Sequence, residues 1–481
     1  MSTTVGIVQG DARGYSEVWR TADEYPEKDQ LRSLGRLLGH EDGNFLRDAV
    51  APGQTVVVKP NWVLDKHPKG LDIFAVLTHS AVVRAVVDLV YEALEGEGSI
   101  TIADAPQWNC DFENLLRVTE IEAISHYYRA RHGFDVRILD LRQMAAGVQA
   151  GWVKYSERVE LAGDPLGYAV VDFGDDSAFI GMPHIERIYG ADYDRSETLL
   201  HHNADKHEYL VSRTILTADT IVHVPKLKVH KKVGVTLNAK GMVGINGHKN
   251  WLAHYRIGPP SEGGDQYPDG RPAAARLRSK AYRVAADLLG TRSKTREAIF
   301  DVLYGTYQLA KPLVGRFLRP SENEVEVEGG NWFGNDTAWR MTADLARAVL
   351  YADNDGRIQE TPQRRFLSVV DGIIAGEEEG PLAASPKPCG VIIAGDNLLA
   401  VDLVGTRLMG FDWQKLQSLR WLVESSPQDV GVGDPRSIAI VSNVEAWQRL
   451  MQDDSAPDLT FAPHPAWVGQ IELTGAAAAA V

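Results

Sequence analysis

Three consecutive valines near the N-terminus place the strongest constraint on the fold. They lie in the run GQTVVVKPNW, residues 53–62, between a glycine and a proline. A short continuous apolar run bounded in this way indicates a strand with both faces buried, which is typical of a parallel sheet covered by helices. Lys59 and Asn61 then come at the carboxyl end of the strand, the edge at which open α/β sheets bind ligands.

The following segments continue an alternation of strands and helices. Residues 78–94 begin with the capping sequence THS and predict a helix, and residues 98–104 predict the next strand. Further buried strands are predicted at residues 366–371, 390–394 and 438–441. We therefore predict an α/β fold that is two-lobed, with mostly parallel buried strands and a helical insertion.

The chain of 481 residues is long enough for more than one lobe, and its composition divides it into three parts. We predict an N-terminal α/β region at residues 1–257, with a loop rich in lysine, histidine and glycine. A helical, basic insertion follows at residues 258–335. The C-terminal α/β region, residues 336–481, carries an acidic, glycine-rich loop.

The balance of charge and the cysteine content limit the function. Fifty Lys and Arg against 65 Asp and Glu give a net charge of −15, so no nucleic-acid partner is expected. The two cysteines, Cys110 and Cys389, form no CxxC pair, which argues against a cysteine-ligated iron–sulfur cluster. The N-terminus lacks a basic region followed by a long apolar run, so no signal peptide is apparent and a cytoplasmic location is expected.

Positive charge is concentrated in one stretch, residues 225–254, with the sequence PKLKVHKKVGVTLNAKGMVGINGHKNWLAH. It holds six lysines, three histidines and four glycines, and no acidic residue. Backbone N–H groups of glycine-rich loops, together with lysines, bind phosphate or carboxylate. A solvated lysine-rich loop with incidental histidines is the alternative.

Histidine and lysine together can supply acid–base chemistry or a covalent amine, so we predict that His230, Lys240 and His254 are catalytic. The residues predicted to bind the ligand are Lys59, Asn61, Lys226, Lys228, Asn238 and Gly241. His223 alternates within an apolar strand and is expected to be a core histidine.

Carboxylates follow another predicted strand. The run VVDGIIAGEEEGP, residues 369–381, is followed by GDNLLAVD, residues 395–402. Carboxylates at a strand end can hold a divalent metal, and we predict this role, or the orientation of the lysines, for Asp371, Glu377 and Asp396. A solvated acidic turn is the alternative.

Two segments of the insertion allow two interpretations each. Residues 271–319 carry eleven Lys and Arg against three Asp and Glu, interleaved with apolar residues. They predict either a solvated face or a peripheral contact with an anionic membrane. The run GGNWFGNDTAWR, residues 329–340, suits recognition of a polar ring or sugar, or only a helix cap.

Taken together, these motifs resemble the DUF362 family, named for a domain of uncharacterised function. The resemblance extends over roughly residues 5–411 and rests on VVKPN (57–61), THS (78–80), IAD (102–104), VPKLKVH (224–230), VTLNAKG (235–241), DGI (371–373), GP (380–381) and residues 396–410. Many members carry ferredoxin-like cysteines, which this chain lacks.

The order His230, Lys240, His254, with intervals of ten and fourteen residues, has a more remote similarity to the nickel-pincer lactate racemases. That resemblance implies a lysine that tethers the cofactor, here Lys240. It also implies histidines that exchange a proton or bind the metal, here His230 and His254.

Two hypotheses about function follow from the sequence. The first is an enzyme that acts on a small anionic metabolite by lysine and histidine acid–base chemistry, with or without a divalent metal. Epimerisation, elimination and group transfer all remain open. The second is a non-catalytic accessory or binding protein of cell-surface polysaccharide or envelope metabolism, peripheral to the membrane.

Overall fold

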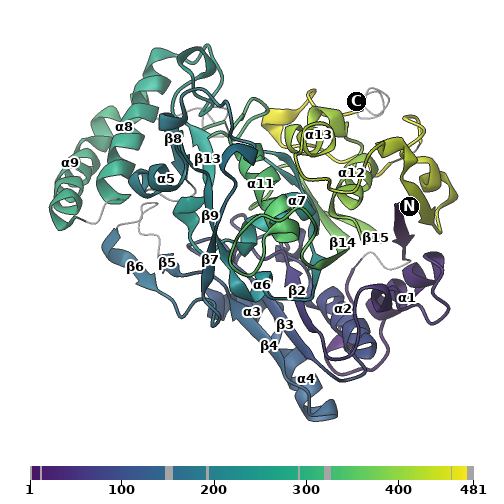
Figure 1. The fold of residues 1–481 in the computed structure, drawn as a ribbon. Helices are drawn as coiled ribbons and strands as arrows, with labels where there is room; N and C mark the ends of the chain where they lie inside the picture. Colours follow the sequence, from purple (N-terminus) through teal and green to yellow (C-terminus); the bar gives the residue numbers. More distant parts are fainter. Residues whose placement is uncertain are drawn as a thin grey trace.

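The computed structural model of the chain describes residues 3–10, 14–146, 155–190, 194–290, 293–318, 327–456 and 458–473, and a ten-stranded sheet lies at its centre (Figure 1). The strands of the sheet are β1 (Thr4–Gln9), β2 (Thr55–Pro60), β3 (Ser99–Asp104), β4 (Val136–Asp140), β10 (Thr220–Val224), β11 (Lys226–His230), β12 (Gly234–Thr236), β14 (Arg365–Glu377), β15 (Ser385–Gly395) and β16 (Ala439–Ser442). Their order is β16-β1-β15-β14-β10-β2-β3-β4, and β11 with β12 extends from β14. Neighbours from β14 to β4 are parallel, whereas β15 is antiparallel to both β14 and β1. The predicted α/β class with mostly parallel strands is confirmed.

The valines of β2 show that the sheet is buried on both faces. Val56 and Val58 belong to one apolar cluster, Val57 belongs to another, and all three are fully buried. Because successive side chains of a strand point to opposite faces, the two clusters lie on the two sides of the sheet. Helices that contribute to the Val56 cluster are α1 (Pro26–Leu37), α2 (Ser80–Ala93), α3 (Phe112–Thr119) and α4 (Glu122–His132), and those of the Val57 cluster include α6 (Arg213–Leu216), α11 (Ala338–Tyr351), α12 (Leu398–Leu408) and α13 (Gln417–Glu424).

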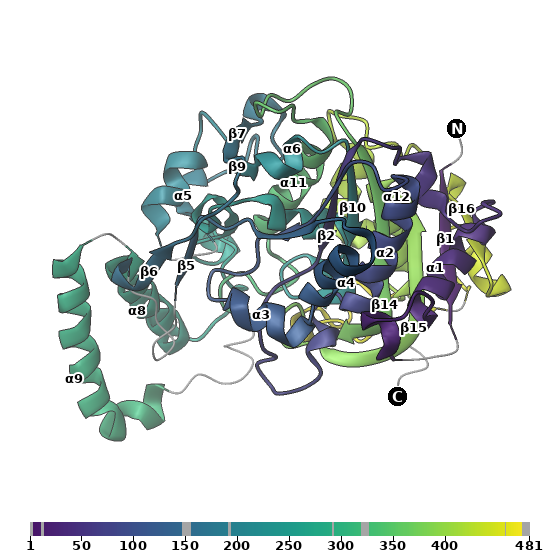
Figure 2. The same cartoon turned by 90° about the horizontal axis from the view of Figure 1, so that it is seen from below.

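A smaller part of the molecule extends beyond β4 and carries the helical insertion. Three two-stranded sheets form it, β5 (Met144–Ala146) with β6 (Arg158–Glu160), β7 (Tyr168–Asp172) with β9 (Glu208–Ser212), and β8 (Ile188–Gly190) with β13 (Ala253–Arg256). Its helices are α5 (Arg195–His201), α8 (Ala273–Gly290) and α9 (Lys294–Leu318). Figures 1 and 2 both place α9 at the outer edge, with α8 between it and the rest of the chain. The boundaries predicted at residues 257/258 and 335/336 stay a prediction.

The C-terminal acidic segment differs from its predicted form. The sequence predicts a strand that ends at Asp371 and a loop after it, but β14 continues to Glu377 and forms a long hairpin with β15. The pairing shifts register between Gly372 and Ile374, an irregularity that accommodates the glycine within the strand. The backbone hydrogen bonds to β15 outweigh the low strand preference of this glycine-rich run.

Candidate functional site

Polar residues that follow several strands meet at one cavity of about 440 Å³. Asn61 follows β2 and Asp104 ends β3. His230 ends β11, Lys240 lies on the short helix α7 (Asn238–Gly241), and His254 lies on β13. The cavity therefore lies at the carboxyl edge of the parallel strands β2 and β3, the usual position of a ligand site in an open α/β sheet.

The three residues predicted to be catalytic, His230, Lys240 and His254, all line this cavity. Burial holds the pKa of both imidazoles well below the ordinary value, and nearby ammonium groups, Lys240 among them, lower it further. Both histidines are therefore neutral at pH 7.

The backbone fixes opposite tautomers in these two neutral histidines. Nδ1 of His230 accepts a hydrogen bond from the backbone N–H of Lys232 (3.0 Å), so its proton lies on Nε2. Nδ1 of His254 donates to the carbonyl oxygen of Leu252 (2.9 Å), so its Nε2 carries a free electron pair. One imidazole can donate a hydrogen bond from Nε2, and the other can accept a proton there.

Lys240 is a half-buried amine without a carboxylate partner. Burial, with the positive charge of Lys59 nearby, lowers its pKa to about 8. No hydrogen bond or ion pair to its ammonium group is present within the described ranges. At neutral pH about a tenth of such an amine is uncharged and nucleophilic, far more than of an ordinary lysine.

Asp402 holds the short helix that carries Lys240. Its carboxylate accepts hydrogen bonds from the backbone N–H groups of Asn238 (2.7 Å) and Ala239 (2.8 Å), the first turn of α7. Burial raises the pKa of Asp402 to about 7. A carboxylate in this position satisfies the free N–H groups of the helix start and fixes the position of Lys240.

Four further lysines line the cavity, and burial lowers the pKa of each, that of Lys249 to about 7. Lys228 donates to the carbonyl oxygens of Val76 (2.5 Å) and Pro381 (3.2 Å), and Lys249 donates to that of Ala105 (2.8 Å). Lys232 donates to the Gly329 carbonyl. These lysines and Lys231 have no ion pair with a carboxylate in the described parts of the chain. Their combined charge makes the cavity suitable for an anion.

The cavity also contains polar groups that have no partner. The buried oxygen atoms Asn61 Oδ1, Gln107 Oε1, Asn331 Oδ1 and Thr236 Oγ1 make no hydrogen bond within the described residues. Buried polar groups are normally hydrogen-bonded, so these atoms are available to the hydroxyl groups of a ligand.

Comparison with family models identifies the family of the chain. The model of the domain of unknown function DUF362 matches residues 56–164 and 180–407, more than half of the chain. The chain belongs to the DUF362 family. The match contains β2, β3, β11, α7 and β13, which supply the cavity residues.

Two further comparisons complete this picture of the DUF362 chain. No match is found among curated proteins. One crystal structure, of a protein from Thermotoga maritima, has 10% sequence identity to this chain and a TM-score of 0.25. That similarity covers 78% of the DUF362 chain and 55% of the Thermotoga protein, so the chain spans little more than half of that protein's length.

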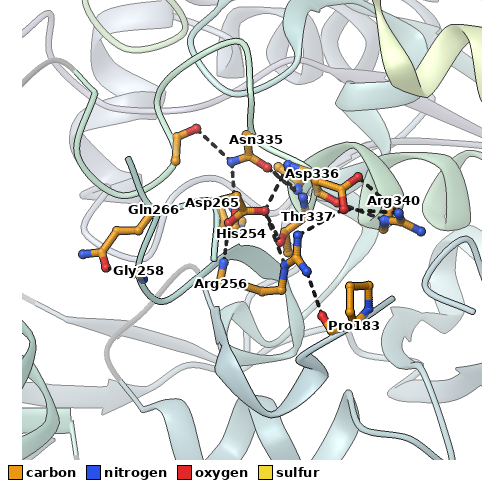
Figure 3. Close-up of polar contacts among 12 residues, drawn as sticks. Pro183, His254, Arg256, Gly258, Asp265, Gln266, Asn335, Asp336, Thr337 and Arg340 are labelled. Atoms are coloured by element: carbon orange, nitrogen blue, oxygen red, sulfur yellow. Dashed lines mark hydrogen bonds and ion pairs between the residues drawn. The ribbon is translucent and has the colours of Figure 1, made fainter. Parts of the chain in front are cut away.

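The loop before α11 closes over His254 in the DUF362 chain (Figure 3). The Asn335 amide donates from Nδ2 to the carbonyl oxygen of His254 (3.0 Å), and its Oδ1 accepts from the backbone N–H groups of Thr337 (2.9 Å) and Ala338 (2.8 Å). Asp265 accepts from Thr337 Oγ1 (2.6 Å) and secures the loop against the insertion. Asn335 thus binds the N–H group of Ala338, the first residue of α11, although the N-cap residue is Thr337, whose side chain makes no capping bond, and Asn331 lines the cavity. The choice between ligand recognition and capping stays open for this segment.

Three of the six residues predicted to bind the ligand, Asn61, Lys228 and Gly241, line the cavity. The other three form internal contacts instead. Lys59 pairs with Asp104 (2.8 Å), and Lys226 pairs with Asp371 (2.9 Å), both fully buried. Asn238 binds Asp402 and His223 (both 2.9 Å). All three residues lie near strand ends, as the sequence predicts. Their polar groups are nevertheless taken up by a buried carboxylate or imidazole and do not face the cavity.

The structure does not bring the predicted metal residues together. Asp371 is fully buried against Lys226, Glu377 pairs with Lys387 (2.9 Å), and Asp396 is exposed. They lie along the β14–β15 hairpin because β14 runs on past Asp371. No group of three His, Cys, Asp or Glu side chains suited to a metal ion occurs among the residues that the structure places.

The sequence interpretation missed several cavity residues. Lys249 belongs to the same acid-free run as Lys240, and this could have marked it. Aromatic residues form part of the wall, namely Trp62, Trp108, Tyr189, Tyr255 and Tyr282. Trp62 comes two residues after the end of β2, so the strand-end rule could have marked it from the sequence. Tyr189 and Tyr282 come from the smaller part of the molecule and carry no local signal.

Proposed function

We propose that the cavity binds a small hydroxylated carboxylate or phosphate and removes a proton from it. The observation that carries the proposal is the pair of neutral histidines, His230 and His254, with opposite tautomers in a cavity lined by lysines. Such a pair provides a hydrogen-bond donor and a base that do not need to exchange roles before reaction.

The lysines and the free oxygen atoms suit the two kinds of group in such a ligand. An anionic group would lie against the ammonium groups of Lys228, Lys231, Lys232 and Lys240, which have no carboxylate partner. Hydroxyl groups would donate to the unpartnered oxygens of Asn61, Gln107 and Asn331. Charge-assisted hydrogen bonds of the first kind are the stronger ones, and contacts of the second kind give selectivity.

The proton step follows from the tautomers. His254 Nε2 takes a proton from a carbon next to a carboxylate or carbonyl, and the electron pair of the C–H bond moves onto the oxygen. His230 donates a hydrogen bond from Nε2 to that oxygen, and the lysines stabilise its charge. Delivery of a proton from a second acid on the opposite face gives epimerisation, whereas loss of a neighbouring substituent gives elimination.

The lysines also link anion binding to the strength of the base. Burial, followed by the charges of Lys232 and Lys240, depresses the pKa of His254 in the free protein. A bound anion cancels part of that positive charge and raises the pKa of His254 again. The base therefore becomes stronger when the ligand is in place.

Proton exchange with solvent tests this proposal directly. Purified protein would be incubated in D2O with 2-hydroxy acids and sugar acids, and loss of the carbon-bound proton would be followed by NMR. We expect exchange with at least one acid, and a loss of 100-fold or more, roughly the size of a general-base contribution, in His254→Gln. His126→Gln on the exposed face of α4 is the matched control. Exchange that persists in His254→Gln would refute the assignment of the base. Binding without exchange would favour the accessory function.

A tethered cofactor is a second candidate, favoured by the position of Lys240. Its amine has a pKa of about 8 and no protein partner within the described residues, as a covalent attachment point requires. The free electron pair of His254 Nε2 could bind a metal, whereas His230 Nε2 carries a proton. A cofactor attached to Lys240 would itself have to supply the other ligands of the metal, because the described residues contain no group of three His, Cys, Asp or Glu side chains suited to a metal ion. An added mass on the intact protein that is absent from Lys240→Ala would support this candidate.

A further inference from the structure

The outer face of helices α8 and α9 is both apolar and basic. Seven of the fifteen large apolar side chains that are exposed among the described residues lie on these two helices. On α9 they are Ile299, Val302, Leu303 and Leu309, of which Val302 is 69% and Leu309 83% exposed. Intervals of three, four and seven residues bring such side chains onto one face of a helix.

The inner faces of the two helices are already used for packing. Ala275, Ala286 and Leu289 of α8 and Phe300 of α9 are buried. Leu277 and Val284 of α8 lie seven residues apart and are 68% and 53% exposed, so they form the outer face of α8. The exposed stripes are therefore not the contact between the helices.

The charge around these stripes is opposite to that of the rest of the chain. Residues 271–319 carry eleven basic and three acidic residues in a chain of net charge −15, although residues 291, 292 and 319 lie outside the described ranges. Arg276 and Lys280 flank Leu277, and Lys294 precedes the stripe of α9, and all three are exposed. Asp301 is the exposed acidic residue of α9 in the part that the structure describes.

We propose that this outer face of α8 and α9 docks on the surface of an anionic lipid bilayer. Exposed basic side chains attract anionic head groups, and an apolar stripe between them enters the interface. A symmetric contact between two copies of the chain would bring two basic faces together and would be repelled, whereas an anionic bilayer attracts this face, so the local charge favours the bilayer over a second copy. No helix in the described ranges is long and apolar enough to cross a membrane, so the contact is peripheral.

The docking face is connected to the cavity through α8. Tyr282 of the same helix lines the cavity, together with Glu328 at the end of the insertion. Ser279 of α8 donates to Glu328 (2.8 Å), which fixes the helix to that wall. Docking would therefore hold the wall of the ligand cavity at the membrane surface.

Vesicle co-sedimentation of the full chain tests the proposal. We expect binding to phosphatidylcholine vesicles that contain phosphatidylglycerol, weak binding to vesicles of phosphatidylcholine alone, and release by high salt. The double variant Val302→Glu, Leu303→Glu should reduce partition roughly tenfold or more, because it removes apolar area and adds repulsion. Lys280→Glu with Lys294→Glu should have a similar effect on anionic vesicles.

Leu200→Glu is the matched control, since Leu200 is 60% exposed and lies on α5, outside the two helices of the proposed docking face. Circular dichroism would verify that each variant is folded. Failure of the wild-type chain to bind anionic vesicles would overturn the proposal, as would equal loss of binding in Leu200→Glu. A concentration-dependent dimer that the Val302, Leu303 variant abolishes, without any vesicle binding, would assign the face to a second copy of the chain instead.

Discussion

Lys226 and Lys240 come from the same acid-free stretch of sequence, yet the fold treats them in opposite ways. Lys226 is fully buried and pairs with Asp371 at 2.9 Å, while Tyr15 and the backbone of His79 bind the same carboxylate. Lys240 lies at a cavity, and no carboxylate reaches it within the described residues. The difference teaches that a buried lysine with a partner is part of the scaffold, whereas a lysine at a cavity without one is available to a ligand.

Removal of the carboxylate from the buried Lys226–Asp371 pair should give the largest change in stability. Asp371→Ala leaves the Lys226 ammonium buried and unpaired, and we expect a loss of about 3–5 kcal/mol in the free energy of unfolding. Urea denaturation followed by circular dichroism measures it. The double variant Lys226→Met, Asp371→Leu should recover most of the stability. A loss in the double variant equal to that in Asp371→Ala would show that the ion pair is not the cause.

Removal of the Lys240 amine should weaken ligand binding and leave the stability of the protein unchanged. Lys240→Met should weaken binding of a sugar acid by about 1.5–3 kcal/mol, the range for a hydrogen bond to a charged group. The free energy of unfolding should stay within about 0.5 kcal/mol of the wild type. Isothermal titration calorimetry and urea denaturation measure the two quantities. Lys66→Met, at an exposed position, is the control, and a large loss of stability in Lys240→Met would place Lys240 in the scaffold.

The pH dependence of ligand affinity gives a further test of the lysines at the cavity. Burial lowers the pKa of Lys240 to about 8 and that of Lys249 to about 7, so both amines lose their charge near or below pH 8 in the free protein. Anion binding favours the protonated amine, so binding takes up protons in this range. The affinity should therefore fall as pH rises above about 8, by roughly tenfold per pH unit for each lysine that must be charged. Calorimetry in buffers of different ionisation enthalpy would detect the proton uptake, and a constant affinity from about pH 7 to about pH 9 would contradict the assignment.

The smallest expected effect concerns the loop over the cavity. Asn335→Ala removes the hydrogen bonds to the N–H groups of Thr337 and Ala338 at the start of α11 and the contact with the His254 carbonyl, with an expected loss of about 0.5–2 kcal/mol in stability. Asn335→Asp keeps the capping oxygen and loses only the amide donor. Ligand affinity that falls in both variants, with stability lost only in Asn335→Ala, would separate the positioning of His254 from the helix cap. Equal stability of all three proteins would contradict the capping role.

The sequence predicted the parts of the fold that depend on local patterns. The valines of β2, the alternation of strands and helices, and the meeting of His230, Lys240 and His254 follow from apolar periodicity and from the rule that ligands bind at strand ends. The partners of Lys59, Lys226 and Asn238 could not be predicted. They come from residues that are distant in sequence, and only the packing of β2, β3, β14 and α12 brings them within reach.

The acidic segment shows the limit of local preference most clearly. Glycines and glutamates after Asp371 indicate a loop, but the neighbouring β15 strand supplies hydrogen bonds that extend β14 to Glu377. A metal site at Asp371, Glu377 and Asp396 required the loop to fold back. The long hairpin separates the three carboxylates instead.

Two glycines limit which side chains the floor of this cavity can accept. A Cβ atom at Gly241 would lie 2.2 Å from the ring of His223, and one at Gly244 would lie 1.9 Å from Asp104. The floor of the cavity is thus closed to new side chains, because each would displace a core histidine or the Lys59–Asp104 pair. Another part of the wall carries Gln266, Tyr282 and Glu328 from the insertion, whose helices stand apart from the central sheet. We therefore expect the residues on the floor of the cavity to vary little between related chains. The choice of ligand should instead vary with the length and sequence of the insertion.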